Sequence, residues 1–255
     1  MSTNRGSELD FAMHLADVAA AVTLAGFGGR IAVELKSDAT PVTAIDSAAE
    51  RAIRDEVART FPKDGFVGEE FGQQAGSSGR TWVVDPIDGT KMFAEGIPLW
   101  TTLIALRTTA GVVAAVADAP ALGNRYHAAR GEGAFRDGQQ IQVSTEQNLS
   151  NALVLHAPVE EFMKGSGIIA LTQVVGASRA SRGIGDGWAH LLVAQGSADA
   201  LVEQGPCFEW DYAATGLIIA EAGGAMTQLD GSPPAPGCHL LVTNKSLAAE
   251  LMAAI

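Results

Sequence analysis

The spacing of apolar and polar residues predicts five helices. Apolar side chains recur every three or four positions in residues 8–30, and a glycine-rich segment ends this stretch. A second helix is expected after Thr43, which would form a capping box with Asp46. The other three expected helices are residues 188–195, 211–222 and 246–255. The pattern therefore places helices early in the chain and throughout its second half.

Short runs rich in β-branched residues predict the strands. Residues 100–107 and 112–118 are separated by Gly111 and predict a hairpin. Residues 35–41 and 71–80 are expected to be loops. The other expected strands are residues 82–84, 125–129, 133–136, 152–156, 173–175, 199–203, 226–229 and 239–243. Because strands and helices alternate irregularly, we expect a layered α/β sandwich.

A mostly polar segment, residues 147–151, is the expected boundary between two parts of the chain. The first part, residues 1–146, is an α+β region that holds most of the acidic motifs. The second part, residues 147–255, is an α/β region that contributes the substrate side and one further acid.

The run from Trp82 to Phe93 joins a short apolar strand to the start of a helix. The strand ends in Asp85 and Asp88, whose mutual repulsion a bound cation would offset. The backbone N–H groups of Gly89 and Thr90, at the following helix start, are suited to an anion such as phosphate. A cation and a phosphate in one turn indicate phosphoryl chemistry.

Composition excludes several classes of function. The formal net charge is −12 and no basic cluster is present, which argues against binding to nucleic acid or anionic membranes. No apolar run approaches the roughly 20 residues of a membrane span, and residues 1–11 lack an apolar signal region. We therefore expect a cytoplasmic protein, in which Cys207 and Cys238 are free buried thiols.

Further acidic residues stand at the ends of apolar runs. Taken singly, Asp46 and Asp211 are good helix caps and Glu69 belongs to a solvated turn. Taken together with Asp85 and Asp88, they form a set of oxygen ligands. Such a set selects hard cations, and ligation that leaves positions for water suits Mg²⁺.

Four motifs resemble the inositol monophosphatase family of Mg²⁺-dependent phosphatases. They are KSDATPVTAID at 36–46, GEE at 68–70, DPIDGTKMF at 85–93 and EWDYAA at 209–214. The resemblance covers nearly the whole chain. It implies the αβαβα sandwich of the inositol monophosphatase and fructose-1,6-bisphosphatase superfamily. It also implies a homodimer, a small phosphate ester as substrate, and two to three Mg²⁺ ions per active site.

The resemblance also implies the metal ligands. Glu69, Asp85 and the carbonyl of Ile87 would hold the first Mg²⁺. Asp85, Asp88 and Asp211 would hold the second. Glu69, largely through water, would help to hold a third.

The catalytic assignments come from the same resemblance. Asp46 and Thr90 match the pair that orients and deprotonates the attacking water, and Glu69 acts with them through the metal. The N–H groups of Gly89 and Thr90 would hold the phosphate. No side-chain nucleophile is required.

Within the family, the chain is most similar to the bacterial histidinol-phosphate phosphatases, which act in histidine biosynthesis. The similarity rests on KSDATPVTAID, DGFVGEEFG, GIPLWTTLIAL, DAPAL, RYHAARGEGAF and RGIGDGW. Histidinol phosphate carries a cationic amine and an imidazole. Acids are therefore expected near the leaving group, and Asp186 and Glu203 are the candidates, with Arg182 on the same side.

Two departures from the subgroup concern the leaving-group pocket. Met92 stands where the subgroup usually has Asn. The segment 203–211 is one residue longer than usual, and Glu209 precedes Trp210. The five histidines lack metal-ligand spacing, so His190 is expected to be structural.

Other functions stay open. An inositol-1-monophosphatase or a broad sugar-phosphate phosphatase would use the same motifs. Haloacid dehalogenase-type phosphatases separate their two acids by one residue, whereas two residues separate Asp85 from Asp88. A non-catalytic regulatory protein that binds Mg²⁺ or an anion would keep the fold and the ligands.

Overall fold

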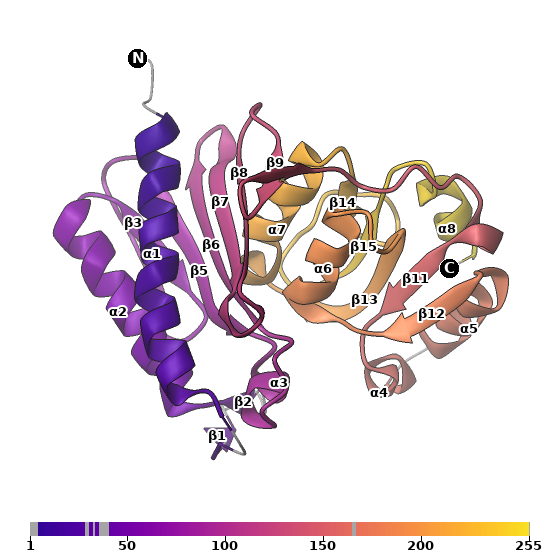
Figure 1. Cartoon of the computed structure of the whole chain (residues 1–255), viewed down its shortest axis with the longest axis horizontal. Coiled ribbons are helices and arrows are strands. Elements are labelled where there is room, and N and C mark those ends of the chain that lie inside the picture. Colours follow the sequence, from indigo (N-terminus) through magenta and orange to yellow (C-terminus); the bar gives the residue numbers. More distant parts are fainter. Residues whose placement is uncertain (1–4, 29–30, 33, 36–40, 165–166, 255) are drawn as a thin grey trace.

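Five layers of helices and sheets stack along the long axis of the molecule (Figure 1). Helices α1 (Arg5–Gly26) and α2 (Ala44–Thr60) form one outer layer, and α6 (Asp186–Ala194) and α7 (Glu209–Glu221) form the middle layer. The computed structural model describes residues 5–28, 31–32, 34–35, 41–164 and 167–254. The predicted αβαβα sandwich is confirmed.

The first sheet lies between the two helical layers that contain α1 and α7. Its strand order is β10-β9-β8-β7-β6-β5-β3-β4, and every neighbouring pair is antiparallel except β3 and β5. The strands are β3 (Gly65–Gly68), β4 (Gly72–Gln74), β5 (Thr81–Asp88), β6 (Thr101–Thr108), β7 (Gly111–Ala119), β8 (Asn124–Ala129), β9 (Ala134–Arg136) and β10 (Gln139–Ile141). The predicted hairpin is the pair β6 and β7.

The second sheet has the order β12-β11-β13-β15-β14, with β11 parallel to both of its neighbours. Its strands are β11 (Leu153–His156), β12 (Ala180–Gly183), β13 (Ala200–Cys207), β14 (Ala225–Thr227) and β15 (Cys238–Thr243). The remaining elements are β1 (Glu34–Leu35), β2 (Pro41–Val42), α3 (Thr90–Ala94), η1 (Pro120–Leu122), η2 (Leu149–Asn151), α4 (Val159–Met163), α5 (Gly167–Ala177) and α8 (Ala248–Ala254). The division of the chain at residue 146 stays a prediction.

Strand β5 is buried on both faces, which explains its continuous apolar start. Trp82 and Val84 pack in the cluster under α1 and α2, whereas Val83 packs in the cluster under α6 and α7. Side chains alternate between the faces of a strand, so Asp85 follows Val83 toward the middle helical layer. This alternation aims the first acid of the motif at the interior between the two sheets.

Two sequence expectations about strands are corrected by the structure. Residues 173–175 lie in helix α5, because their apolar, β-branched run packs against the second sheet as part of a helix. The strand that follows is β12, a polar edge strand that an apolar pattern does not reveal. The expected loop at 71–80 contains the exposed edge strand β4.

The expected loop at 35–41 is also shorter than predicted. Leu35 and Pro41 pair with each other in the β1–β2 ribbon, and residues 36–40 lie outside the described part of the chain. The first five residues of the KSDATPVTAID motif are therefore not placed. The capping box of Thr43 and Asp46 at the start of α2 is confirmed.

Helix α1 is long and apolar, and its match to a membrane span was not expected from the sequence. By length and mean hydropathy, its residues 8–26 match a membrane span, as core helices of globular domains also can. Ala12, Leu15, Ala16 and Ala19 are fully buried against the first sheet. The expected free buried thiols of the chain's two cysteines are confirmed.

Candidate metal centre and active site

A bulge in β5 brings Asp85 and Asp88 to one side of the sheet. Between the pairs Asp85–Leu103 and Asp88–Thr101, β5 advances by three residues while β6 advances by two. In a regular strand, residues three apart point to opposite faces. The one extra residue of the bulge returns the side chain of Asp88 to the face of Asp85. Pro86 lies in this bulge, where a missing N–H removes no ladder bond. The two acids of the DPID motif therefore face the same interior space.

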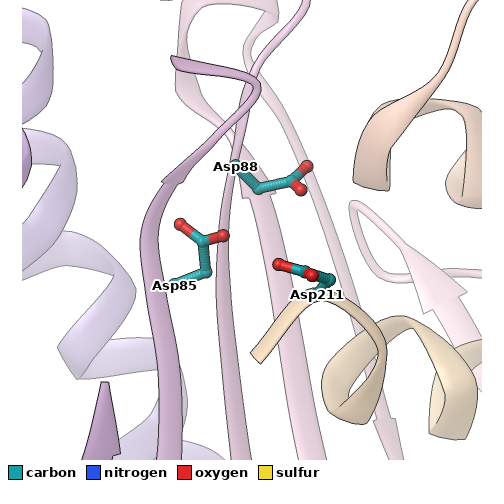
Figure 2. A group of neighbouring side chains, drawn as sticks. All are labelled: Asp85, Asp88 and Asp211. Carbon is teal, nitrogen blue, oxygen red and sulfur yellow. The ribbon is translucent and has the colours of Figure 1, made fainter. Parts of the chain in front are cut away.

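Asp211 completes a cluster of three carboxylates (Figure 2). It lies in the first turn of α7, and one oxygen each of Asp85, Asp88 and Asp211 lie within 4.8 Å of one another. Within the described residues, no lysine or arginine forms an ion pair with any of the three. The cluster is suited to a hard cation, because its donor atoms are all carboxylate oxygens.

Asp211 is not the N-cap that the sequence suggested. Helix α7 begins at Glu209, Phe208 is the cap residue, and Asp211 occupies the third helical position. Its Oδ2 accepts the N–H of Phe208 at 2.6 Å. The helix start thus holds one oxygen of Asp211 and leaves the other directed toward Asp85 and Asp88.

Asp46 has the corresponding position in α2. Its Oδ2 accepts both the N–H and the hydroxyl of Thr43, while its Oδ1 accepts the hydroxyl of Thr90 at 3.2 Å. That hydroxyl also lies 3.1 Å from the carbonyl oxygen of Ile87. The structural and the catalytic readings of Asp46 are therefore compatible, since each uses a different oxygen.

Asp88 is held by two donors that sequence reasoning missed. Its Oδ2 accepts the N–H of Gly187 at 2.6 Å and the hydroxyl of Thr101 at 2.9 Å. A Cβ at position 187 would lie 2.6 Å from that same oxygen, so only glycine permits the approach. Gly187 is 99 residues from Asp88, and no local pattern signals this contact.

The turn between β5 and α3 is tightly built. Gly89 caps α3 with φ of +89°, a conformation that favours glycine. Ile87 is fully buried with Phe93 and Trp100, and its N–H donates to Asp85 Oδ1 at 3.0 Å. Packing of the buried Ile87 side chain thus holds the turn in place. The backbone N–H groups proposed for phosphate lie in this turn.

Burial and like charges raise the pKa of the clustered acids. Burial, followed by the charges of Glu69, Asp88 and Asp211, raises the pKa of Asp85 well above its ordinary value. Burial likewise raises the pKa of Asp211 to about 8, although the Phe208 N–H opposes the shift. The same causes raise the pKa of Asp88. Each ionised carboxylate is costly here, and a bound cation would offset that cost.

Glu69 lies in the turn between β3 and β4, outside the group of oxygens within 4.8 Å. Its charge contributes to the raised pKa values of Asp85 and Asp211, so its carboxylate faces the same space. This separation is consistent with the expectation that Glu69 ligates partly through water.

The expected substrate-side acids lie next to the cluster. Asp186 begins α6 with φ of +59°, and its Oδ2 lies 3.5 Å from the position that a Cβ of Gly89 would take. Burial, and then the charge of Glu203, raise the pKa of Asp186 to about 6. Within the described residues, its carboxylate accepts no hydrogen bond, unlike those of Asp85 and Asp88. Asp186 is therefore free to take an external donor.

Glu203 is buried in β13, and both of its oxygens are bonded. Oε1 accepts the Asp186 N–H at 2.9 Å, and Oε2 lies 2.6 Å from Nε2 of His190. Burial acts to raise the pKa of Glu203, but the charge and hydrogen bond of His190 outweigh it and lower the pKa. Arg182 is exposed on β12 and donates to the carbonyl of Ser181, away from these contacts.

The segment 203–211 contacts the first sheet near its end, and its greater length than in the subgroup stays a prediction. Glu209 forms an ion pair with Arg107 of β6 at 2.8 Å. Phe208 stacks on Trp210 with ring centroids 5.1 Å apart. The segment therefore reaches across to the first sheet before Asp211 enters the cluster. Met92 lies in the short helix α3.

Comparison with known proteins identifies the family. The model of the inositol monophosphatase family matches residues 6–255. The chain is 39% identical to a histidinol-phosphatase of Streptomyces coelicolor, over 96% of this chain and 95% of that protein. It is 38% identical to a histidinol-phosphatase of Chlorobaculum parvum, over 97% and 96% of the two chains.

The crystal structure of the extragenic suppressor protein suhB of Bartonella henselae superposes with a TM-score of 0.89. The two chains are 28% identical, and the superposition covers 97% of this chain and 98% of the other. Fold, acidic cluster and sequence motifs agree with these matches. The chain therefore belongs to the inositol monophosphatase family of phosphatases.

Proposed function

We propose that this protein is a Mg²⁺-dependent phosphatase that hydrolyses L-histidinol phosphate to L-histidinol and phosphate. The carboxylate cluster of Asp85, Asp88 and Asp211 supports the metal dependence. The unbonded carboxylate of Asp186 beside the Gly89 turn supports a cationic leaving group. Two matched relatives are histidinol-phosphatases, which supports the same substrate.

Two to three Mg²⁺ ions are proposed for each active site. Glu69, Asp85 and the carbonyl of Ile87 would hold one, Asp85, Asp88 and Asp211 another, and Glu69 would help with a third. Bound Mg²⁺ supplies positive charge for the phosphoryl oxygens and lowers the pKa of water. The chain's own residues supply the orientation described for each carboxylate.

Thr90 and Asp46 are proposed to act on the attacking water. The hydroxyl of Thr90 donates to Asp46 Oδ1 at 3.2 Å, which leaves the lone pairs of Thr90 Oγ1 able to accept from water. Burial raises the pKa of Asp46, although hydrogen bonds from Thr43 and Thr90 oppose this. A carboxylate with a raised pKa is a stronger base, so the pair is suited to receive the proton.

The N–H groups of Gly89 and Thr90 are proposed to hold the phosphate. Both belong to the first turn of α3, where N–H groups have no partner within the helix. Asp186 would then hold the amine of the alcohol, with Glu203 beside it, and Arg182 is kept as a proposed substrate-side residue although its guanidinium donates to the Ser181 carbonyl. The Arg182 assignment rests on its sequence motif.

A substrate panel tests the proposal. We expect kcat/KM for histidinol phosphate to exceed that for inositol 1-phosphate by at least about tenfold, since one buried polar contact contributes about this much. A preference for inositol 1-phosphate would support the rival reading as an inositol-1-monophosphatase. No hydrolysis of any phosphate monoester at millimolar Mg²⁺ would instead support a non-catalytic, regulatory protein.

The role of Asp186 is tested by Asp186→Asn. The amide keeps the size of the side chain and loses the charge, so KM for histidinol phosphate should rise about tenfold. The matched control is Asp230→Asn on an exposed turn, which should behave as the wild type. An unchanged KM in D186N would remove Asp186 from the pocket.

A homodimer in the cytoplasm is the proposed physiological state. The family resemblance supports the dimer, and the two free buried thiols, which suit a reducing compartment, support the location. Sedimentation of the purified chain at micromolar concentration tests the dimer, and a monomer would contradict it.

A further inference from the structure

His190 connects three elements around the substrate side. It is 1% exposed in α6. Its Nε2 lies 2.6 Å from Glu203 Oε2 in β13, and its Nδ1 lies 2.9 Å from Thr215 Oγ1 in α7. Both ring nitrogens therefore have oxygen partners on other elements, and the ring is held at both ends.

The partners of the ring determine its orientation. Glu203 Oε2 is a carboxylate acceptor, so Nε2 of His190 is the donor in the 2.6 Å contact. The Thr215 hydroxyl lies 2.9 Å from Nδ1 and 3.3 Å from the carbonyl oxygen of Asp211, and its single proton can serve one of them at a time. With either choice, Nε2 occupies Oε2 of Glu203.

This pairing removes Glu203 as a free acceptor. Oε2 is taken by His190, and Oε1 takes the N–H of Asp186 at 2.9 Å. Glu203 thereby fixes the backbone of Asp186, which stands at a positive φ that side chains rarely adopt. Packing is close here, since a Cβ at Gly185 would lie 3.4 Å from Glu203 Oε1.

The two hydrogen bonds to Glu203 have a consequence for the leaving group. Without His190, Glu203 would have an oxygen able to compete with Asp186 for an external donor. With both Glu203 oxygens occupied, Asp186 is the acid of this pair whose carboxylate accepts no hydrogen bond from the described residues, and it stands beside the Gly89 turn.

We propose that His190 is a positioning residue for substrate selection: it occupies Oε2 of Glu203 and keeps Oε1 bonded to the Asp186 backbone, so that Asp186 alone binds the cationic amine of the alcohol. This proposal rests on the proposed function. His190 touches neither the phosphate turn nor the three-carboxylate cluster, so it acts on the alcohol through Glu203 and Asp186.

Two amide variants separate the ring's contacts. His190→Asn keeps a donor near Nδ1 but does not reach Glu203, whereas His190→Gln carries an amide donor to about the position of Nε2. We expect H190N to raise KM for histidinol phosphate about tenfold, with kcat within about threefold of the wild type. H190Q should restore most of the KM.

Phenyl phosphate is the control substrate, because its leaving group has no amine for Asp186. Both variants should hydrolyse it with wild-type KM and kcat. Thr215→Val is the control variant, because it removes only the Nδ1 partner; its KM for histidinol phosphate should stay within about threefold of the wild type. Equal losses on both esters, or a wild-type KM in H190N, would overturn the role of His190.

A spectroscopic test needs only the wild-type protein. A ¹⁵N–¹H spectrum of the histidine side chains should contain a hydrogen-bonded Nε2–H of His190, absent from the H190Q spectrum. A His190 ring with no proton on Nε2 would overturn its role as the donor to Glu203. A wild-type enzyme that cleaves phenyl phosphate but not histidinol phosphate would overturn the substrate assignment as well, whereas failure of the variants alone overturns only the role of His190.

Discussion

At the scale of single residues, the three clustered carboxylates share one arrangement, in which one oxygen of each accepts a hydrogen bond from the protein. That oxygen is Oδ2 in Asp88 and Asp211, and Oδ1 in Asp85. Asp46 differs, because Thr43 donates to its Oδ2 and the Thr90 hydroxyl donates to its Oδ1. A carboxylate with a fixed partner cannot rotate freely, so the proposed ligand atoms are arranged before any cation binds.

Asp88→Asn should lower kcat at saturating Mg²⁺ by at least about 100-fold, which corresponds to about 3 kcal/mol. The amide can still accept from Gly187 and Thr101, but the negative charge toward the cluster is lost. Steady-state rates across a Mg²⁺ titration measure this. Thr101→Val is the matched control, since it removes one holding bond and keeps the charge; its loss should be much smaller. Near-wild-type rates in D88N would contradict the metal assignment.

Thr90→Ala should lower kcat more than it raises KM, because the hydroxyl contacts Asp46 rather than the leaving group. Thr90→Ser keeps the hydroxyl and should retain most of the rate. Michaelis profiles of both variants separate the two parameters. A raised KM with unchanged kcat would make Thr90 a binding residue only.

At the scale of elements, two irregularities build the site. The bulge in β5 turns Asp88 to the face of Asp85, and the start of α6 brings the N–H of Gly187 onto Asp88. Each is a departure from regular geometry that the neighbouring element stabilises. In β5 the neighbour is β6, where the Thr102 hydroxyl donates to the carbonyl of Pro86 at 2.8 Å.

Gly187→Ala should displace Asp88 and reduce the apparent affinity for Mg²⁺. The added Cβ would lie 2.6 Å from Asp88 Oδ2 and 2.8 Å from Thr101 Oγ1. Mg²⁺ titrations of activity and of melting temperature measure the effect. Gly176→Ala in α5 is the control, because a Cβ there meets nothing within 4 Å; it should be neutral or stabilising by up to about 1 kcal/mol. Unchanged Mg²⁺ dependence in G187A would contradict the proposed geometry.

At the scale of the whole molecule, the site forms where the layers meet. Asp85 and Asp88 come from the first sheet, Asp211 and Gly187 from the middle helices, and Glu203 from the second sheet (Figure 1). These segments are in register only when both sheets pack on α6 and α7. Metal binding is therefore expected to stabilise the packing of the layers.

Mg²⁺ should raise the melting temperature by an increment that grows from pH 5 to pH 8. Burial raises the pKa of Asp211 to about 8 and that of Asp186 to about 6, above the ordinary value of 3.8. A raised carboxyl pKa means that the native state holds the proton more tightly, so its contribution to stability is present below about pH 4. That contribution is lost as the pH rises through these pKa values, whereas bound Mg²⁺ favours the ionised carboxylates.

Thermal melts with Mg²⁺ and with a chelator, at three pH values, measure the increment. Asp211→Asn is the control, since it removes a ligand and the main titrating group, and should abolish most of the increment. The same increment at pH 5 and pH 8 in the wild type would contradict the coupling.

Sequence patterns predicted the features that depend on neighbouring residues. The capping box of Thr43 and Asp46 follows from a three-residue spacing. The alternation of helices and strands predicted a layered α/β sandwich, and the resemblance to the family implied its αβαβα order. Residues 173–175 were wrongly predicted to be a strand, because a short apolar run satisfies both strand and helix patterns. The start of α7 was predicted two residues late, at Asp211, because the helix starts at Glu209 without a polar cap side chain.

The amino-acid sequence by itself determined the acids, their local turns and the family to which they belong. Only the tertiary structure decided which acids meet and which distant donors hold them. The Gly187 N–H reaches Asp88 across 99 residues, and His190 meets Glu203 and Thr215 from different layers. The physical reason is that such bonds depend on how α6 packs between the sheets. The periodicity of apolar and polar residues along the chain gives no information about contacts between distant segments.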